Sequence, residues 1–305
     1  MKSVNLLIGV LCFYLNILNG NSQDSSSVAV ANEMCKRYTE DAKKNHICPL
    51  PLETRIIGGM LAEKGEFPHM VQLAYSKSNT TKYFCSGFII SKNYILTAAH
   101  CVDDVAINKP KFLRAGVTDV NDVSNEQVRS IDSVIIHPQF KRPEIYNDIA
   151  LIKVTEDFNF NKFVSPICLY TSDEDPDGYG VHPGWGPTGE DFGNEEKQTQ
   201  MIKLSLNIDS NESCNNTYFP LIKGILPEGI VTNKIVCAGG KTGGCQVDSG
   251  SPLQINRKTS DEKPCMYDAV GVSSFGPRNC DKKGLPTAFT RISNYIKWIQ
   301  VNVWP

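Results

Sequence analysis

One short segment places a serine where it could act as a nucleophile. Residues 243–252 read GGCQVDSGSP, so Ser249 lies in a tight turn that is bracketed by glycines and follows Cys245. A serine hydroxyl is a weak nucleophile near neutral pH unless a neighbouring base accepts its proton and a third group orients that base. If this turn does chemistry, the chain must therefore supply both groups elsewhere.

Candidates for the base and for the group that orients it lie upstream. His100 follows an apolar run and precedes Cys101, and Asp148 opens another apolar strand. Each residue alone is weak evidence, because motifs are hypotheses until their context supports them. Together they predict acyl transfer to serine and then to water. In that reaction His100 takes the proton of Ser249 during attack on a peptide carbonyl, and Asp148 holds the imidazole.

In these three segments, and in their order along the chain, the sequence resembles the trypsin-like serine proteases. The resemblance runs from Ile56 to the C-terminus. It implies an all-β fold of two packed six-stranded β-barrels, the chymotrypsin fold, with a C-terminal helix and the catalytic groups between the barrels. The runs GEFPHM at 65–70 and CMY at 265–267 look most like arthropod members related to Snake. Relatives of that kind act in extracellular cascades or as venom or salivary components.

Short apolar runs separated by turns agree with an all-β fold. Few helices are expected apart from Ile292 to about Val303, where apolar residues recur at helical spacing. The expected strands are Met70–Ala74, Phe88–Ile90, Tyr94–Thr97, Val134–Ile136, Ile149–Val154, Lys203–Ile208, Ile235–Ala238, Ala269–Ser273 and Ala288–Arg291.

The N-terminus predicts export. Residues 1–20 contain an apolar run that is typical of a secretory signal peptide and too short to span a bilayer comfortably. Of the eleven cysteines, Cys12 leaves with this peptide, and the even number that remains suits an oxidising compartment. We expect a secreted, extracellular glycoprotein whose sequons are at Asn79, Asn211 and Asn215.

The net charge and the spacing of possible metal ligands indicate which binding partners to expect. The formal net charge of −2 suggests neither nucleic acid nor an anionic membrane. No cofactor and no metal site are expected, since the acidic loop over 119–126 is irregular and the remaining histidines lack ligand spacing. Those histidines are His46, His69, His137 and His182. The expected partners are protein or peptide substrates, an upstream trypsin-like activating protease and serpin-type inhibitors.

Residues 21–55 have the composition of a propeptide. They are polar and charged, without a period that would bury a face, and they contain only Cys35 and Cys48. The six-cysteine module of some arthropod relatives therefore cannot form. The run RIIGG that starts at Arg55 resembles the family's activation junction, which makes 56–305 the catalytic domain.

The resemblance implies a zymogen that is inert until it is cut after Arg55. The new ammonium group of Ile56 would then insert beside Asp248 and shape the oxyanion hole and the specificity pocket. The physical argument agrees, because a buried carboxylate needs a cation and an uncut chain has none to offer.

The expected oxyanion hole departs from the family pattern. Its donors are the backbone amides of Val247 and Ser249, and most relatives have glycine at the position of Val247 and again at that of Ser251. A β-branched residue resists positive φ, and loss of one donor costs roughly a hundred- to a thousandfold in turnover. Either the backbone tolerates valine, with reduced or narrowed activity, or the protein is a catalytically weak homologue that acts as a binding cofactor. The intact triad and activation junction favour the first reading.

The resemblance places the specificity pocket around four residues. Gly243 forms its floor, Gly276 and Thr287 its walls, and Ser274 lies near the catalytic aspartate on the strand that pairs with substrate. A pocket for arginine or lysine needs a carboxylate at the floor, which Gly243 does not supply. We therefore expect a chymotrypsin-like or elastase-like preference for apolar P1 residues.

The resemblance also implies most of the disulfides. They are Cys85–Cys101, Cys214–Cys237, Cys245–Cys280 and, to hold the propeptide, Cys48–Cys168. Cys35 and Cys265 remain, and Cys35 could pair with Cys265 or with Cys48.

Overall fold

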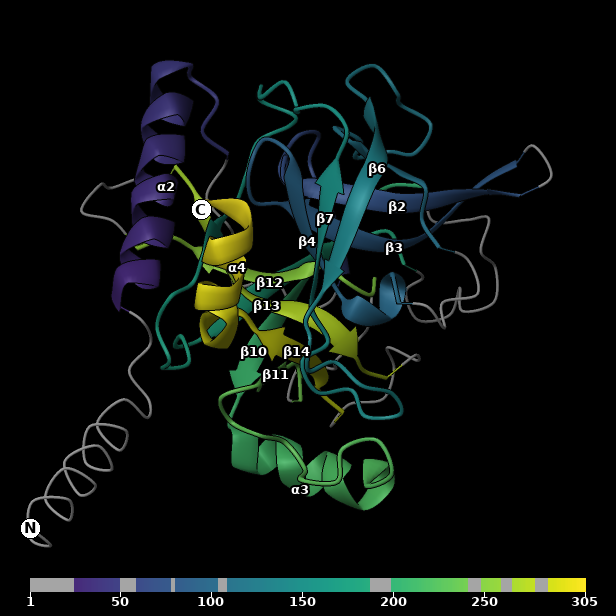
Figure 1. The fold of residues 1–305 in the computed structure, drawn as a ribbon, viewed down its shortest axis with the longest axis vertical. Helices are drawn as coiled ribbons and strands as arrows, with labels where there is room; N and C mark the ends of the chain where they lie inside the picture. Colours follow the sequence, from purple (N-terminus) through teal and green to yellow (C-terminus); the bar gives the residue numbers. More distant parts are fainter. Residues whose placement is uncertain are drawn as a thin grey trace, which may run out of the picture.

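The computed structural model describes residues 25–49, 59–77, 80–103, 109–186, 199–240, 248–258, 265–277 and 285–305. Figure 1 shows two groups of strands, with two helices from opposite ends of the chain beside them.

The first group of strands is a closed antiparallel barrel with the strand order β2-β3-β4-β7-β6-β5. Apolar side chains that no solvent reaches, such as Leu73, Phe88, Ile95 and Leu151, fill it. Its strands are β2 (Met70–Lys77), β3 (Thr80–Ile89), β4 (Tyr94–Thr97), β5 (Phe112–Ala115), β6 (Gln127–Ile136) and β7 (Ala150–Val154).

The second group also closes into a ring. Strand β9 pairs with both β10 and β12, so β9, β10, β11, β14, β13 and β12 form a second barrel, while β1 pairs with β10 and β8 with β13. The all-β prediction and the two six-stranded barrels are confirmed. The strands are β1 (Gly59–Leu61), β8 (Cys168–Leu169), β9 (Tyr179–Gly184), β10 (Ile202–Asp209), β11 (Ile235–Ala238), β12 (Pro252–Asn256), β13 (Tyr267–Phe275) and β14 (Thr287–Arg291).

The expected C-terminal helix is present. It begins as the 3₁₀ turn η3 (Ile292–Tyr295) and continues as α4 (Ile296–Val303). A further helix, α3 (Asn211–Ile222), was not expected, and Ser210 caps it by accepting a hydrogen bond from the backbone N–H of Ser213. None of the helices in the described ranges is long and apolar enough to cross a membrane.

The expectation that 21–55 buries no face is wrong. Helix α2 (Ser25–Lys44) packs beside α4, and its Ser27 hydroxyl donates to Gln300 Oε1 at 3.2 Å (Figure 1). The buried face consists of small side chains near helical spacing, which are Ser27, Ala31, Cys35 and Ala42. Small residues give little hydrophobic signal, and this is why the sequence pattern did not reveal the face.

Two disulfides join α2 and the segment after it to the second barrel, and their pairings differ from those that we expected. Cys168 pairs with Cys35 and not with Cys48, and Cys48 pairs with Cys265. Both proposed partners of Cys35, Cys265 and Cys48, are therefore wrong. The cause is the docking of α2, which brings Cys35 to β8. The Cys85–Cys101 and Cys214–Cys237 bridges are present, and Cys245 and Cys280 lie outside the described residues.

Two of the expected glycosylation sites lie on α3. The side chain of Asn215 is engaged, since its Oδ1 accepts from the backbone N–H of Ile230 at 2.9 Å. A glycan would attach to Nδ2 of Asn215, so this hydrogen bond to Oδ1 does not occupy the atom that the glycan would use. Asn211 is partly buried, and Asn79 lies outside the described residues.

Candidate active site

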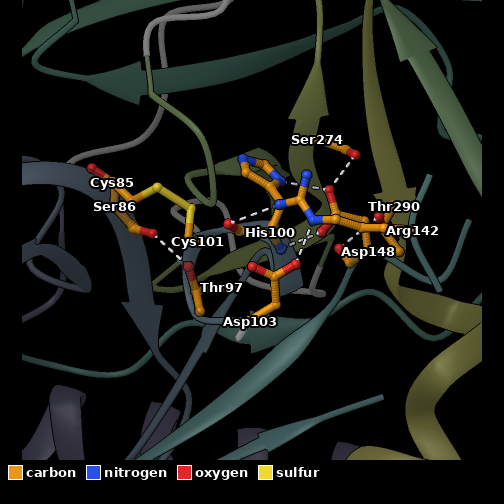
Figure 2. Close-up of polar contacts among 10 residues, drawn as sticks. All are labelled: Cys85, Ser86, Thr97, His100, Cys101, Asp103, Arg142, Asp148, Ser274 and Thr290. Carbon is orange, nitrogen blue, oxygen red and sulfur yellow. Dashed lines mark hydrogen bonds and ion pairs between the residues drawn. A yellow bond between two sulfur atoms is a disulfide. The ribbon is translucent and has the colours of Figure 1, made fainter. Parts of the chain in front are cut away.

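His100 and Asp148 meet at the edge of the first barrel. His100 lies in the 3₁₀ turn η1 (Ala99–Cys101) directly after β4, and the Cys85–Cys101 disulfide ties this turn to β3. His100 Nδ1 lies 2.7 Å from Asp148 Oδ2, and the backbone N–H of His100 donates to Oδ1 at 2.9 Å (Figure 2). The two contacts use both carboxylate oxygens and fix the imidazole relative to Asp148.

The second barrel completes the surroundings of Asp148. Ser274 on β13 donates its hydroxyl to Asp148 Oδ2 at 2.5 Å, and Thr290 on β14 donates to the Asp148 carbonyl at 2.9 Å (Figure 2). Asp148 is 0% exposed. The sequence placed Ser274 near the aspartate, and the structure brings the two together. Asp148 therefore lies where the two barrels contact each other.

The His100–Asp148 pair sets the charge of both groups. Burial by itself lowers the pKa of His100 and raises the pKa of Asp148, because it disfavours the charged forms. Attraction and hydrogen bonding between the two groups outweigh burial, so the pKa of His100 is raised and the pKa of Asp148 is lowered. Asp148 thus stays ionised while His100 is able to accept a proton.

The turn that carries Ser249 is held against both barrels. The backbone N–H of Ser86 on β3 donates to the Ser249 carbonyl, and the N–H of Gly250 donates to the Ser273 carbonyl, each at 2.9 Å. Gly250 has φ of +86°, and a Cβ there would lie 2.2 Å from the Ser86 carbonyl oxygen. Only glycine fits at this position, and it lets the serine turn approach β3 closely.

The carboxylate of Asp248 has neutral partners. Its Oδ2 accepts from the Ser86 hydroxyl at 3.0 Å and from the backbone N–H of Trp185 at 2.6 Å. Burial raises the pKa of Asp248 to about 6, and the two hydrogen bonds oppose that rise. Within the described ranges no ion pair includes this carboxylate, and Arg55 and Ile56 lie outside them.

Two of the residues expected at the specificity pocket adjoin each other. A Cβ on Gly276 would lie 3.0 Å from Thr287 Oγ1, and Thr287 is buried. Ser274 is buried on the neighbouring stretch of β13. Gly243 and Val247 lie outside the described residues, so the floor of the pocket and one expected oxyanion donor are not described.

Sequence reasoning missed an ion pair beside His100. Arg142 Nε donates to Asp103 Oδ2 at 2.5 Å, and a second guanidinium nitrogen of Arg142 donates to the His100 carbonyl at 3.4 Å (Figure 2). Arg142 lowers and Asp103 raises the pKa of His100, and both effects are smaller than that of Asp148. No sequence signal joins two residues that are 39 positions apart.

Two groups of side chains have the composition of metal ligands in the described part of the chain. They are Cys85, His100 and Cys101, and Cys35, Cys168 and Asp268. In both groups the cysteine sulfurs are already joined in disulfides, so they are not available as thiolate ligands.

Two β-barrels, a partly buried histidine paired with a buried aspartate, and a serine turn tied to both barrels define a serine protease of the chymotrypsin type. Comparison with known families agrees. The family model named Trypsin matches residues 56–299, so the chain belongs to the trypsin family and is a serine-type endopeptidase.

Similar proteins come from arthropods. The chain is 34% identical over 286 residues to "Clotting factor G beta subunit" of Tachypleus tridentatus, covering 90% of this chain and 88% of that protein. It is 31% identical to "Serine protease snk" of Drosophila melanogaster over 87% of this chain and 63% of that protein. It is also 31% identical to "Phenoloxidase-activating factor 3" of Holotrichia diomphalia, covering 84% and 74%.

Proposed function

We propose that the chain is the zymogen of a secreted endopeptidase, which cleavage after Arg55 activates. The active enzyme hydrolyses peptide bonds in protein substrates with Ser249 as nucleophile, His100 as general acid and base, and Asp148 as the group that orients His100. The observation that carries this proposal is the contact at 2.7 Å between His100 Nδ1 and the buried carboxylate of Asp148.

The contacts of Asp248 support the zymogen part of the proposal. A carboxylate that has only neutral donors keeps a raised pKa, here about 6, and a nearby ammonium group would lower it. Cleavage after Arg55 would create such a group at Ile56. The arginine at the junction calls for an upstream protease of trypsin-like specificity.

The two disulfides to the N-terminal segment support a two-chain active form. After cleavage, residues up to Arg55 would remain attached through Cys35–Cys168 and Cys48–Cys265. Relatives named as a clotting factor subunit and as a phenoloxidase-activating factor support a role in an extracellular cascade, in which serpin-type inhibitors would control the enzyme. A venom or salivary role is the other extracellular setting.

The substrate preference that we propose is an apolar P1 residue. Gly243 offers no carboxylate for arginine or lysine. The Thr287 side chain lies so close to Gly276 that a Cβ at position 276 would be 3.0 Å from Thr287 Oγ1, which supports a pocket whose width Thr287 limits. A library of internally quenched peptides would test this preference, and cleavage mainly after arginine would contradict it.

Turnover before and after cleavage tests the proposal as a whole. Uncut protein and protein cut after Arg55 are assayed with the same peptide library, with cut Ser249→Ala as the control. We expect turnover in the cut protein alone, and none in the control. A correctly cut and folded protein that does not turn over any peptide would instead support the weak homologue that acts as a binding cofactor.

A further inference from the structure

We propose that Ser251 and His182 are positioning residues, which orient the backbone N–H of Ser249 as an oxyanion donor. The inference rests on the proposed function and concerns how the same site stabilises the developing negative charge. The two side chains are fully buried, and neither belongs to the catalytic triad.

The hydroxyl of Ser251 holds the peptide on the N-terminal side of Ser249. Ser251 Oγ donates to the Asp248 carbonyl at 2.9 Å, and the backbone N–H of Ser251 lies 3.4 Å from the same oxygen. In a trans peptide the C=O and the next N–H point in opposite directions within one plane. A contact that fixes the Asp248 carbonyl therefore also fixes the direction of the Ser249 N–H.

Backbone contacts do not hold this peptide as firmly as its neighbours. The Ser86 and Gly250 amides fix the peptide after Ser249, at 2.9 Å each, and the N–H of Ser273 donates to the Ser251 carbonyl at 2.8 Å. In the peptide before Ser249, the Asp248 carbonyl accepts the 3.4 Å contact from the Ser251 N–H and the 2.9 Å contact from the Ser251 hydroxyl. Of these two contacts from Ser251, the one from the side chain is the shorter, at 2.9 Å.

His182 on β9 keeps the Ser251 hydroxyl aimed at the Asp248 carbonyl. His182 Nδ1 lies 3.2 Å from Ser251 Oγ and 3.1 Å from the Pro252 carbonyl. A carbonyl can only accept, so Nδ1 carries the proton and donates it. The Ser251 oxygen then accepts from His182, which leaves its own proton for the Asp248 carbonyl.

Burying His182 has an energetic cost, because one of its ring nitrogens has no hydrogen-bond partner among the described residues. Once Nδ1 is the donor, Nε2 carries the lone pair, and it has no hydrogen-bond partner among the described residues. An unpaired buried polar atom lowers the stability of the fold. Burial lowers the pKa of His182 to about 4, so the ring is neutral at ordinary pH, and the Pro252 carbonyl favours the tautomer with the proton on Nδ1. An apolar residue would avoid the penalty, but it would not orient Ser251.

The proposal also explains why the sequence departs from the family at two nearby positions. Valine replaces the usual glycine at 247, which concerns one expected oxyanion donor, and serine replaces the usual glycine at 251. The Ser251 hydroxyl restrains the peptide that supplies the other donor, Ser249 N–H. The proposal thus gives the serine at position 251 a role in the oxyanion hole that a glycine there would not have.

The test compares Ser251→Ala with wild type, both cut after Arg55. Losing a complete oxyanion donor lowers kcat by about 10²- to 10³-fold, so a donor that is only less well oriented should lower it by less, roughly tenfold. KM for a peptide substrate should not change. The inhibition constant of a matched peptide aldehyde, whose adduct places an oxyanion in the hole, should rise by the same factor as kcat falls.

Two further variants make the test specific. Thr39→Val removes a hydroxyl that bonds to a main-chain carbonyl at 2.8 Å on α2, and both readouts should stay at wild-type values. His182→Phe removes the donor to Ser251 together with the contact between Nδ1 and the Pro252 carbonyl. The same two readouts should change in parallel, by about threefold, a fraction of the loss of a full donor. If Ser251→Ala does not fold, the comparison of His182→Phe with wild type tests the proposal instead.

The outcomes separate this inference from the proposed function. If the cut wild type turns over substrate but kcat and aldehyde affinity are unchanged in both variants, the positioning role is wrong and the protease remains. A fall in kcat without weaker aldehyde binding also overturns it, because the oxyanion is then not involved. A cut wild type that does not turn over substrate contradicts the proposed function itself.

Discussion

Asp148 and Asp248 are the same residue type in two neighbouring parts of the site, yet their surroundings shift their pKa values in opposite directions. Asp148 is fully buried, and contact with His100 lowers its pKa. Asp248 is partly exposed as a residue. Among the described residues, the donors to its carboxylate are the Ser86 hydroxyl and a backbone amide, and its pKa is raised to about 6. Burial acts in the same direction on both, so the partner decides the charge.

This difference divides the site into two parts. Folding alone completes the surroundings of Asp148, whereas we propose that cleavage supplies the cation beside Asp248. The partners of Asp148 come from the barrels themselves, so the His100–Asp148 pair is complete in the uncut chain. Asp248 lacks a cation among the described residues, and we propose that the cut at Arg55 supplies one. The predictions that follow change one side of this comparison at a time.

Removing the charge of Asp148 should have the largest effect. Asp148→Asn in the cut enzyme should lower kcat by about 10⁴-fold, because the amide favours the wrong tautomer of His100. The raised pKa of His100 also places the acidic limb of the kcat/KM profile above its ordinary midpoint of about 6.5, since His100 must lose its proton to act as base. In Asp148→Asn this limb should move to lower pH. A loss of less than about tenfold would mean that Asp148 does not orient the base.

Removing the Ser274 hydroxyl should have a smaller effect on the same carboxylate. Ser274→Ala loses a hydrogen bond to a charged group, which is worth about 1.5–3 kcal/mol. We expect a lower free energy of unfolding by that amount and a fall in kcat/KM of roughly tenfold. Chemical denaturation and steady-state kinetics measure the two quantities.

Ser273→Ala is the matched control for Ser274→Ala. The adjacent Ser273 hydroxyl is also buried, but it has no hydrogen-bond partner in the described part of the chain. Ser273→Ala should change stability and kcat/KM little. If the two alanine variants behave alike, the Ser274–Asp148 contact does not stabilise the aspartate.

The pH dependence of stability tests the other side of the comparison. In the uncut chain the folded state binds the proton of Asp248 more tightly than the unfolded state does, because its pKa is raised. This contribution is present below the ordinary carboxyl pKa of about 3.9 and is lost as the pH rises through about 6. The expected loss is on the order of 2 kcal/mol.

Asp248→Asn isolates this contribution in uncut protein. The pKa of Asp268 is also raised to about 6, so the wild type alone would report both groups. Denaturation at pH 4 and pH 7 should show a smaller loss of stability in Asp248→Asn than in the wild type. Equal losses would mean that Asp248 is not neutral in the uncut fold.

How far the sequence predicts this structure depends on how local each signal is. Apolar runs lie within a few residues, so they predicted most of the barrel strands. The approach of Ser274 to Asp148, 126 positions away, was predicted from the family resemblance and not from a local pattern. The pairing of Cys35 with Cys168 joins residues 133 positions apart and depends on where α2 docks. A buried face of small residues does not predict that docking.

The side-chain contacts of the serine turn could not be predicted from the sequence for a similar reason. The Ser86 hydroxyl and the imidazole of His182 reach the turn because β3 and β9 pass beside it, and such contacts follow from the packed barrels rather than from any motif. Sequence reasoning identified Asp248 and flagged Ser251 as unusual. It could not assign their neutral partners.

Covalent labelling of Ser249 by a fluorophosphonate probe tests the central claim most directly. Uncut wild type, cut wild type, cut Asp248→Asn and cut Ser249→Ala are labelled under the same conditions. We predict rapid labelling of cut wild type alone, because only this sample combines the Ser249 hydroxyl with the ammonium group of Ile56 and the carboxylate that receives it. Equal labelling of uncut and cut wild type, or of cut Asp248→Asn and cut wild type, would contradict the account.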